Sequence, residues 1–225
     1  MSASSSPEDA QAFYGRWARL YDYLARFTPG IASLRRRAAA ACRLEPGDTV
    51  VEMGCGTGAN LPFLAEAVGT DGSVLGIDFT RPVLERAREP TADVENVHLV
   101  RGDATEPPVA DDVDAVLATF VAGMLPEPAA AVADWCDLVS PGGHVVLVNA
   151  ARSRQPYAPP INALFRAVVV LSTPPTTKLR YEDDPTRRLD ARITAAHDRL
   201  RDRADAIADE RHALGVVRLT GGRIP

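Results

Sequence analysis

The sequence predicts an α/β fold, a doubly wound and mostly parallel β-sheet. Short apolar runs alternate with segments of helical periodicity between residues 48 and 150, which is the rhythm of βαβ units. A glycine-dense turn joins the first apolar run to the helix that follows it. At 225 residues the chain is long enough for one sizeable domain with additions.

The N-terminal part is expected to be helical and to cap the functional site. Residues 1–7 are predicted to be disordered, and residues 8–47 to hold two helices. The first, Glu8 to Phe27, repeats apolar and aromatic side chains every three or four residues. The second, Ile31 to Leu44, contains three consecutive arginines at positions 35–37.

The central part, residues 48–150, is expected to form the ligand-binding core. Gly69 ends the helix behind the glycine turn, and Thr80 is the predicted N-cap of the next helix. The strands are predicted at Val50–Glu52, Ser73–Asp78, Val97–Arg101, Asp114–Phe120 and His144–Val148. The helices are predicted over Leu61–Val68, from Thr80 to Arg88 or Glu89, and from Pro126 or Glu127 to Leu138.

The C-terminal part, residues 151–225, is expected to be a helical lid or substrate region with one final strand. A short apolar helix is predicted from Ile161 to Leu171, and a charged helix or helix pair from Arg187 to Arg211. Val216–Leu219 is predicted to be strand six. Few residues follow it, so strand seven is expected to be absent or vestigial and the sheet edge to be shortened.

The glycine turn is the most informative motif. Gly54, Gly56 and Gly58 follow a G-x-G-x-G pattern, and with Ala59 the first two also fit G-x-G-x-x-G/A. Glycine lets the backbone turn sharply and approach a ligand without a Cβ in the way. Free amides at the start of the following helix would then face a bound molecule. An adenosine-bearing cofactor is therefore expected here.

Two carboxylates help to choose between adenosine cofactors. Glu52 stands two residues before Gly54, where it would repel a pyrophosphate but attract the cationic amino group of S-adenosylmethionine. Asp78 ends the second strand, where a carboxylate can accept hydrogen bonds from ribose hydroxyls. The pattern favours S-adenosylmethionine, and an NAD-dependent oxidoreductase remains the alternative.

These elements resemble, in order, the class I S-adenosylmethionine-dependent methyltransferases, with a methyltransferase type 11/25-like domain and a Rossmann-like sheet. The resemblance implies that Asp103 receives the adenine amino group and that the end of the fourth strand lines the floor of the site. The expected cofactor-binding residues are Tyr14, Glu52, Gly54, Cys55, Gly56, Gly58, Asp78, Phe79, Asp103, Ala104 and Thr119.

Two further stretches are similar to narrower groups of that family. The pattern Y-x-x-W-A-x-x-Y-D begins at Tyr14 and resembles phosphatidylethanolamine N-methyltransferases and, more loosely, quinone C-methyltransferases. The stretch from Phe120 to Pro128 resembles the same phospholipid group. The resemblance implies methyl transfer to a small molecule or lipid headgroup, such as the amine of phosphatidylethanolamine. The alternatives are a quinone-type C-methyltransferase and a non-catalytic, cofactor-binding partner subunit.

Methyl transfer is an in-line displacement that depends mainly on positioning. No base is identified from the sequence, and Tyr14 and Tyr21 are the candidate catalytic residues. His98 and His144 begin strands, so a structural role is expected for them. His197 and His212 are expected to be solvated.

Composition bears on the possible partners, metal sites and location of the protein. The net charge of −5 leaves no basic footprint for nucleic acid. Three scattered cysteines indicate neither a disulfide framework nor a metal site. The sequence shows no signal peptide and no membrane-spanning run, so a cytoplasmic location is expected. Peripheral membrane contact through residues 35–37 and 161–171 is a further hypothesis, and the oligomeric state is left open.

Overall fold

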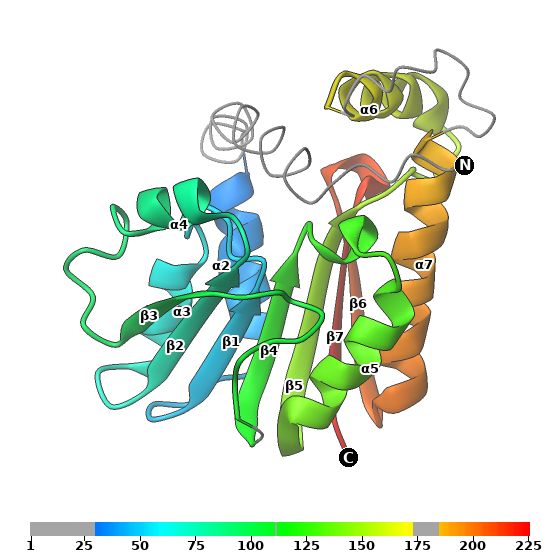
Figure 1. The fold of residues 1–225 in the computed structure, drawn as a ribbon. Helices are drawn as coiled ribbons and strands as arrows, with labels where there is room; N and C mark the ends of the chain where they lie inside the picture. Colours follow the sequence, from blue (N-terminus) through cyan, green and yellow to red (C-terminus); the bar gives the residue numbers. More distant parts are fainter. Residues whose placement is uncertain (1–29, 111, 173–184) are drawn as a thin grey trace, which may run out of the picture.

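The computed structural model describes residues 30–110, 112–172 and 185–225 (Figure 1). They form a seven-stranded sheet in the order β3-β2-β1-β4-β5-β7-β6. Strands β1 to β5 are parallel, and β7 runs antiparallel to both β5 and β6. The predicted doubly wound, mostly parallel sheet is confirmed. The strands are β1 Thr49–Met53, β2 Ser73–Asp78, β3 Val97–Arg101, β4 Val113–Thr119, β5 Val139–Ala150, β6 Ala206–His212 and β7 Val217–Arg223.

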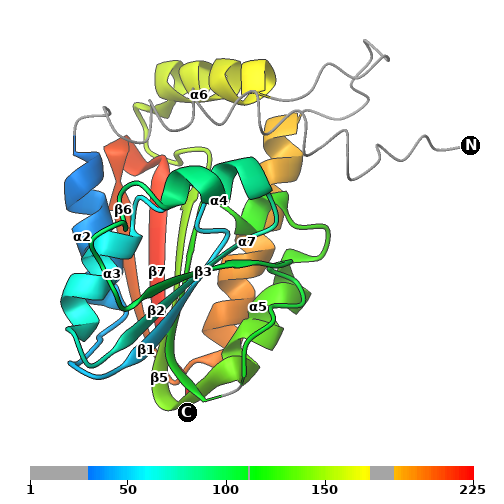
Figure 2. The same cartoon turned by 60° about the vertical axis from the view of Figure 1, so that its left-hand side comes forward.

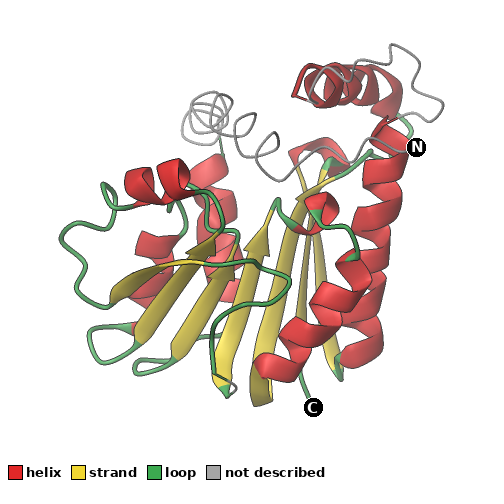
Figure 3. Ribbon diagram, viewed as in Figure 1, coloured by secondary structure: helices red, strands yellow, loops and turns green. Residues whose placement is uncertain are grey.

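Helices cover both faces of the sheet (Figures 1 and 3). Helices α5 and α7 pack against one face of the sheet, where Trp135 is fully buried. Helices α2 and α3 pack against the other face, where Leu64 is fully buried. Because both faces are covered, Ala115–Ala118 of the central strand β4 are completely buried. The helices are α2 Ile31–Ala41, α3 Leu61–Val68, α4 Arg81–Ala87, α5 Pro128–Leu138, α6 Ala158–Ser172 and α7 Pro185–Arg203, with short 3₁₀ turns at Ala122–Met124 and Ala213–Gly215.

Helix α6 is the exception to this layering. It lies beyond the carboxyl ends of the parallel strands, across the top of the molecule in both orientations (Figures 1 and 2). In open α/β sheets this edge is where ligands bind. The position of α6 is compatible with the predicted lid, and the division of the chain into domains stays a prediction.

The prediction for the last strands was wrong. The charged segment does not continue as a helix to Arg211, because α7 ends at Arg203 and Ala206–His212 forms the edge strand β6. Val216–Leu219 does not form strand six, because the strand in this place is β7, which extends to Arg223. Strand seven is present, and the sheet edge is not shortened. An edge strand lacks a second neighbour, so most of β6 is exposed and polar and carries no clear apolar alternation.

The structure bears on four other predictions, which concern the N-terminal residues, His197, membrane spans and metal sites. Residues 1–29, which include Tyr14 and Tyr21, lie outside the described residues. His197 was expected to be solvated, but it is buried between α7 and the sheet. Within the described ranges no helix is long and apolar enough to cross a membrane, and no group of ligating side chains could hold a metal ion.

Candidate active site

A hydrogen-bonded network lies at the carboxyl edge of the sheet and joins β1, β4 and the start of α3. The side-chain amide of Asn60 donates to Glu52 Oε1 at 2.5 Å and lies 2.8 Å from Thr119 Oγ1. The Thr119 hydroxyl lies 3.1 Å from the same oxygen of Glu52. Asn60 is the residue before α3 and makes no side-chain cap hydrogen bond to the helix. Its side chain instead positions the acid.

Glu52 is the unusual member of this network. The residue is fully buried, and burial raises the pKa of its carboxyl to about 7, although hydrogen bonds from Asn60 and Thr119 oppose the shift. Its second oxygen, Oε2, has no hydrogen-bond partner among the described residues. A buried carboxylate oxygen without a donor is costly. The site therefore holds an acceptor that a ligand with N–H groups would satisfy.

The three consecutive arginines of α2 do not form one patch. Arg35 donates to Asn60 Oδ1 at 2.8 Å and so joins the Glu52 network. Arg36 stacks over the ring of Phe63 at 5.5 Å, and Arg37 pairs with Glu210 at 3.4 Å. Each guanidinium has its own contact, so only Arg35 belongs to the Glu52 network, and membrane contact through residues 35–37 stays a prediction.

The glycine turn adopts the conformation that its sequence requires. Gly54, Gly56 and Gly58 all have positive φ angles, of 64°, 57° and 76°. A Cβ on Gly54 would come within 2.6 Å of a Val121 methyl group. A Cβ on Gly56 would meet nothing within 4 Å. Gly54 is thus required by packing within the protein, whereas Gly56 faces open space beside the acidic network.

Asp78 is tied to the same turn. Its carboxylate accepts the backbone N–H of Gly56 at 3.1 Å and that of Thr80 at 2.8 Å. Burial raises the pKa of Asp78, and these two hydrogen bonds oppose the increase. A carboxylate has about four lone-pair sites, so its two oxygens can accept further donors such as ribose hydroxyls.

The remaining predicted residues surround the turn at the ends of β2 and β3. Phe79 is 42% exposed directly after Asp78. Asp103 is also exposed and accepts hydrogen bonds from the backbone and hydroxyl of Thr105. Ala104 is buried and its carbonyl accepts the indole N–H of Trp135. Cys55 is buried within the turn, and burial raises the pKa of its thiol well above the usual value.

Sequence reasoning missed the contacts of two residues at this edge and the backbone conformation of a third. Arg35 and Asn60 join the network although neither belongs to a recognisable motif. Phe120, the first residue after β4, has a positive φ of 59° and remains 40% exposed. This conformation is unfavourable for a bulky side chain, and such strain is concentrated at functional sites. For Asn60, the available signal was its position directly before a predicted helix.

The fold and the site define an α/β protein with a glycine turn flanked by carboxylates, an arrangement that suits an adenosine cofactor. Comparison with known proteins agrees, since a methyltransferase domain family matches residues 50–143. The chain is 39% identical over 158 residues to a phosphatidylethanolamine N-methyltransferase of Cereibacter sphaeroides, covering 68% of this chain and 74% of that enzyme.

Two other relatives extend the comparison. A demethylmenaquinone methyltransferase of Staphylococcus aureus is 35% identical over 132 residues, which cover 58% of this chain and 55% of that enzyme. The chain thus spans about half the length of this second relative. The fold matches a crystal structure of a SAM-dependent methyltransferase from Aquifex aeolicus with a TM-score of 0.61, at 19% identity and over 94% and 98% of the two chains.

The protein belongs to the class I S-adenosylmethionine-dependent methyltransferases and is an enzyme of that family. The alternatives of an NAD-dependent oxidoreductase and of a non-catalytic subunit are therefore set aside. The site fits S-adenosylmethionine, because the unsatisfied Oε2 of Glu52 suits an ammonium group. The open side of Gly56 leaves room for a ligand close to the backbone, and the contact of Asp78 with the ribose hydroxyls stays a prediction.

Proposed function

We propose that this methyltransferase acts on the primary amine of a phosphatidylethanolamine headgroup. The similarity to the Cereibacter sphaeroides enzyme carries the proposal, because it extends over 74% of that relative, beyond the cofactor-binding core. The N-terminal pattern that begins at Tyr14 supports the same substrate class. Tyr14 and Tyr21 remain the proposed residues on the substrate side.

S-adenosylmethionine supplies the electrophilic methyl group for this reaction. The protein has to hold the acceptor amine in line with that group and keep water away. Such positioning can replace about 7–11 kcal/mol of the activation barrier. Phe120 and Met124 support this role, since their apolar side chains are 40% and 48% exposed beside the end of β4. Thr119, which precedes Phe120, belongs to the Glu52 network.

A quinone-type C-methyltransferase is the second candidate. It rests on the similarity to demethylmenaquinone methyltransferase. The same exposed apolar side chains would suit the ring of a quinone. The two acceptors differ in charge, because a quinone ring carries neither an amine nor a phosphate group.

A transfer assay with labelled S-adenosylmethionine separates the two acceptors. One arm contains phosphatidylethanolamine vesicles and the other contains a demethylated menaquinone in detergent. We expect label in the phospholipid, and less of it with Asp78→Ala at the same limiting cofactor concentration. Label in the quinone alone would replace the first proposal by the second. Tyr14→Phe and Tyr21→Phe, assayed in the same way, test the two proposed tyrosines.

We also propose peripheral contact with the cytoplasmic face of a membrane. Helix α6 supports this, because Leu164 is 68% exposed and the nearby Tyr157 is 53% exposed. Apolar side chains on a surface helix can insert at a lipid interface. Co-sedimentation with anionic vesicles in moderate salt checks the proposal, with Leu164→Ser as the variant expected to bind less. Wild-type protein that remains in the supernatant would contradict it.

A further inference from the structure

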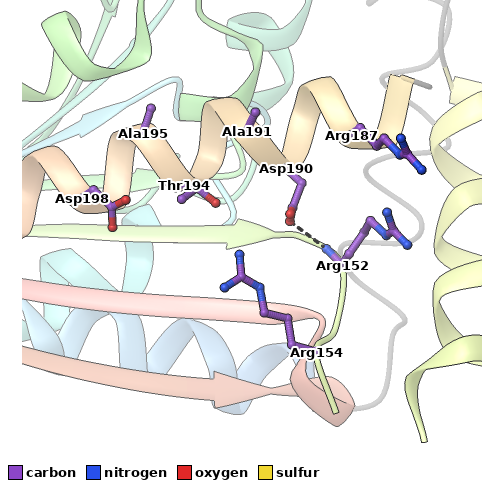
Figure 4. Close-up of a pocket in the computed structure, with 8 residues that line it drawn as sticks. All are labelled: Arg152, Arg154, Arg187, Asp190, Ala191, Thr194, Ala195 and Asp198. Atoms are coloured by element: carbon purple, nitrogen blue, oxygen red, sulfur yellow. Dashed lines mark hydrogen bonds between the residues drawn. The ribbon is translucent and has the colours of Figure 1, made fainter. Parts of the chain in front are cut away.

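A second group of arginines lines an open pocket outside the cofactor site. Arg152 and Arg154 follow the end of β5, and Arg187 lies in the first turn of α7. The pocket has a volume of about 670 Å³. Figure 4 shows the side chains of Arg152 and Arg187 extending toward one another, whereas that of Arg154 extends away from this pair. The lining residues are Arg152, Arg154, Arg187, Asp190, Ala191, Thr194, Ala195 and Asp198.

Both acids of this pocket are already paired with other arginines. Asp190 binds the guanidinium of Arg218 at 3.2 Å and accepts the backbone N–H of Arg152. Asp198 pairs with Arg201 at 2.7 Å. Neither Arg201 nor Arg218 lines the pocket. Within the described part of the chain, the guanidiniums of residues 152, 154 and 187 have no carboxylate partner.

The surroundings add to the positive potential. Arg218 is buried beside the pocket, and burial lowers its pKa, with the charge of Arg154 contributing to the decrease. Helix α7 has no acidic residue in its first turn, so Arg187 adds its charge to the positive end of the helix dipole. Uncompensated like charges destabilise a folded protein. An anion bound between them would relieve that cost.

The arginine surface continues toward α6. A neighbouring pocket of about 560 Å³ shares Arg152 and Arg154 and adds Arg166 of α6. Ser153, Asn162 and Thr186 contribute polar side chains to it. Both pockets follow the carboxyl end of β5, which pairs directly with β4. Glu52, Thr119 and the glycine turn lie at the same edge of the sheet, one and two strands away.

We propose that this arginine pocket binds the phosphate ester group of the methyl acceptor, an inference that rests on the proposed function. Guanidinium groups bind phosphate oxygens through charge-assisted and often bidentate hydrogen bonds. A phosphate held after β5 would leave the attached amine free to reach along the edge toward the cofactor site. The pocket would thereby select acceptors that carry a phosphate.

Binding titrations test the pocket without relying on methyl transfer. The ligands are phosphoethanolamine, ethanolamine and inorganic phosphate, each added in low salt to protein saturated with S-adenosylhomocysteine. The test variant is Arg154→Ala/Arg187→Ala, which removes two exposed side chains. Arg199→Ala is the matched control, because Arg199 is exposed on the same helix and does not line the pocket.

We expect phosphoethanolamine to bind wild type and Arg199→Ala equally, and the double variant at least about tenfold more weakly. Equal binding by all three proteins would overturn the inference, as would equal affinity for ethanolamine and phosphoethanolamine. Binding of inorganic phosphate alone would also overturn it, since the site would then not accept an ester. Thermal unfolding of the double variant checks that its fold is intact.

The outcomes for the two proposals remain distinct. If phosphoethanolamine binds through these arginines but phosphatidylethanolamine receives no methyl group, the proposed acceptor is wrong and the phosphate-ester pocket stands. If phosphatidylethanolamine is methylated equally well by wild type and the double variant at limiting lipid, the acceptor is right and the pocket assignment fails.

Discussion

The Glu52 network and the network around His197 are both buried, but they differ in hydrogen bonding. One contains a polar atom without a partner, and in the other the central ring is fully engaged. In the Glu52 network, Oε1 receives two hydrogen bonds while Oε2 receives none. In the second network, His197 of α7 lies 2.7 Å from Thr220 Oγ1 and 3.2 Å from Asn149 Oδ1. Both nitrogens of its ring are therefore engaged.

The His197 network is closed within the protein. The hydroxyl of Thr220 also contacts Asp209, which pairs with Arg201. Burial lowers the pKa of His197 to about 4, so the ring is neutral near pH 7. These contacts join α7 to β5, β6 and β7.

The comparison separates stabilising networks from binding ones. A buried polar group with all its partners can stabilise a single arrangement of the chain. A buried group that lacks one partner reduces stability until a ligand supplies it. The Glu52 network is incomplete at the edge where the cofactor is expected, whereas the His197 network needs nothing from outside. Four substitutions can break or sharpen this contrast.

Among these substitutions, Glu52→Gln should have the largest effect, which is a loss of cofactor affinity. It removes the charge that an ammonium group would pair with, so we expect cofactor affinity to fall by about 3 kcal/mol, roughly a hundredfold in Kd. Calorimetric titration measures this loss. Asn60 and Thr119 can still donate to the amide oxygen, so the fold should survive.

The same variant has a definite pH dependence. Folding raises the Glu52 pKa from 4.5 to about 7, so ionising the buried group destabilises the free enzyme as the pH rises through this window. The cost reaches about 3 kcal/mol above pH 7. Without cofactor, Glu52→Gln should therefore gain stability over wild type as the pH rises from 5 to 8. A constant difference in Tm across this range would contradict the assignment.

Asp78→Ala should reduce cofactor affinity by about 1.5–3 kcal/mol, because charge-assisted hydrogen bonds to the ribose are lost. Its carboxylate also accepts the Gly56 and Thr80 amides, so a smaller loss of stability is expected as well. Titration and thermal unfolding separate the two effects. Unchanged affinity would show that Asp78 does not contact the cofactor.

His197→Ala should act on stability and not on cofactor binding. Truncation removes the His197 partner of Asn149 and one of the two contacts of the Thr220 hydroxyl, which costs about 2 kcal/mol in the free energy of unfolding. Urea unfolding measures the loss, and calorimetry should give an unchanged cofactor Kd. His212→Ala is the matched control, because His212 is only partly buried. A large change in Kd for His197→Ala would mean that the two networks are coupled.

Phe120→Asn should have the smallest effect, and it should increase stability where His197→Ala decreases it. Asparagine tolerates a positive φ better than phenylalanine, so the variant should gain about 1 kcal/mol in stability. Turnover should fall if the ring contacts the acceptor. For the stability measurement alone, Phe79→Asn is a suitable control, because Phe79 is similarly exposed but lacks a positive φ. Reduced stability in Phe120→Asn would show that the ring stabilises the fold.

The predictability of each element follows from its physical origin. Helix α3 was predicted with the observed ends, Leu61 and Val68, because Pro62 and Gly69 mark its boundaries locally. The central parallel strands β1 and β4 are mostly apolar because both of their faces are buried, so they too were recognised. Strand β6 was missed because an exposed edge does not need apolar residues. The contacts of Arg35 and Asn60 depend on how distant elements pack, which no local pattern encodes.

The hydrogen bond between Trp135 and the Ala104 carbonyl provides an optical signal for the enzyme. The indole is fully buried, and its partner directly follows Asp103, the expected adenine contact. Closure of that loop on a nucleoside would alter the polarity around the ring. The fluorescence emission of this tryptophan should therefore shift when the cofactor docks, without an added dye.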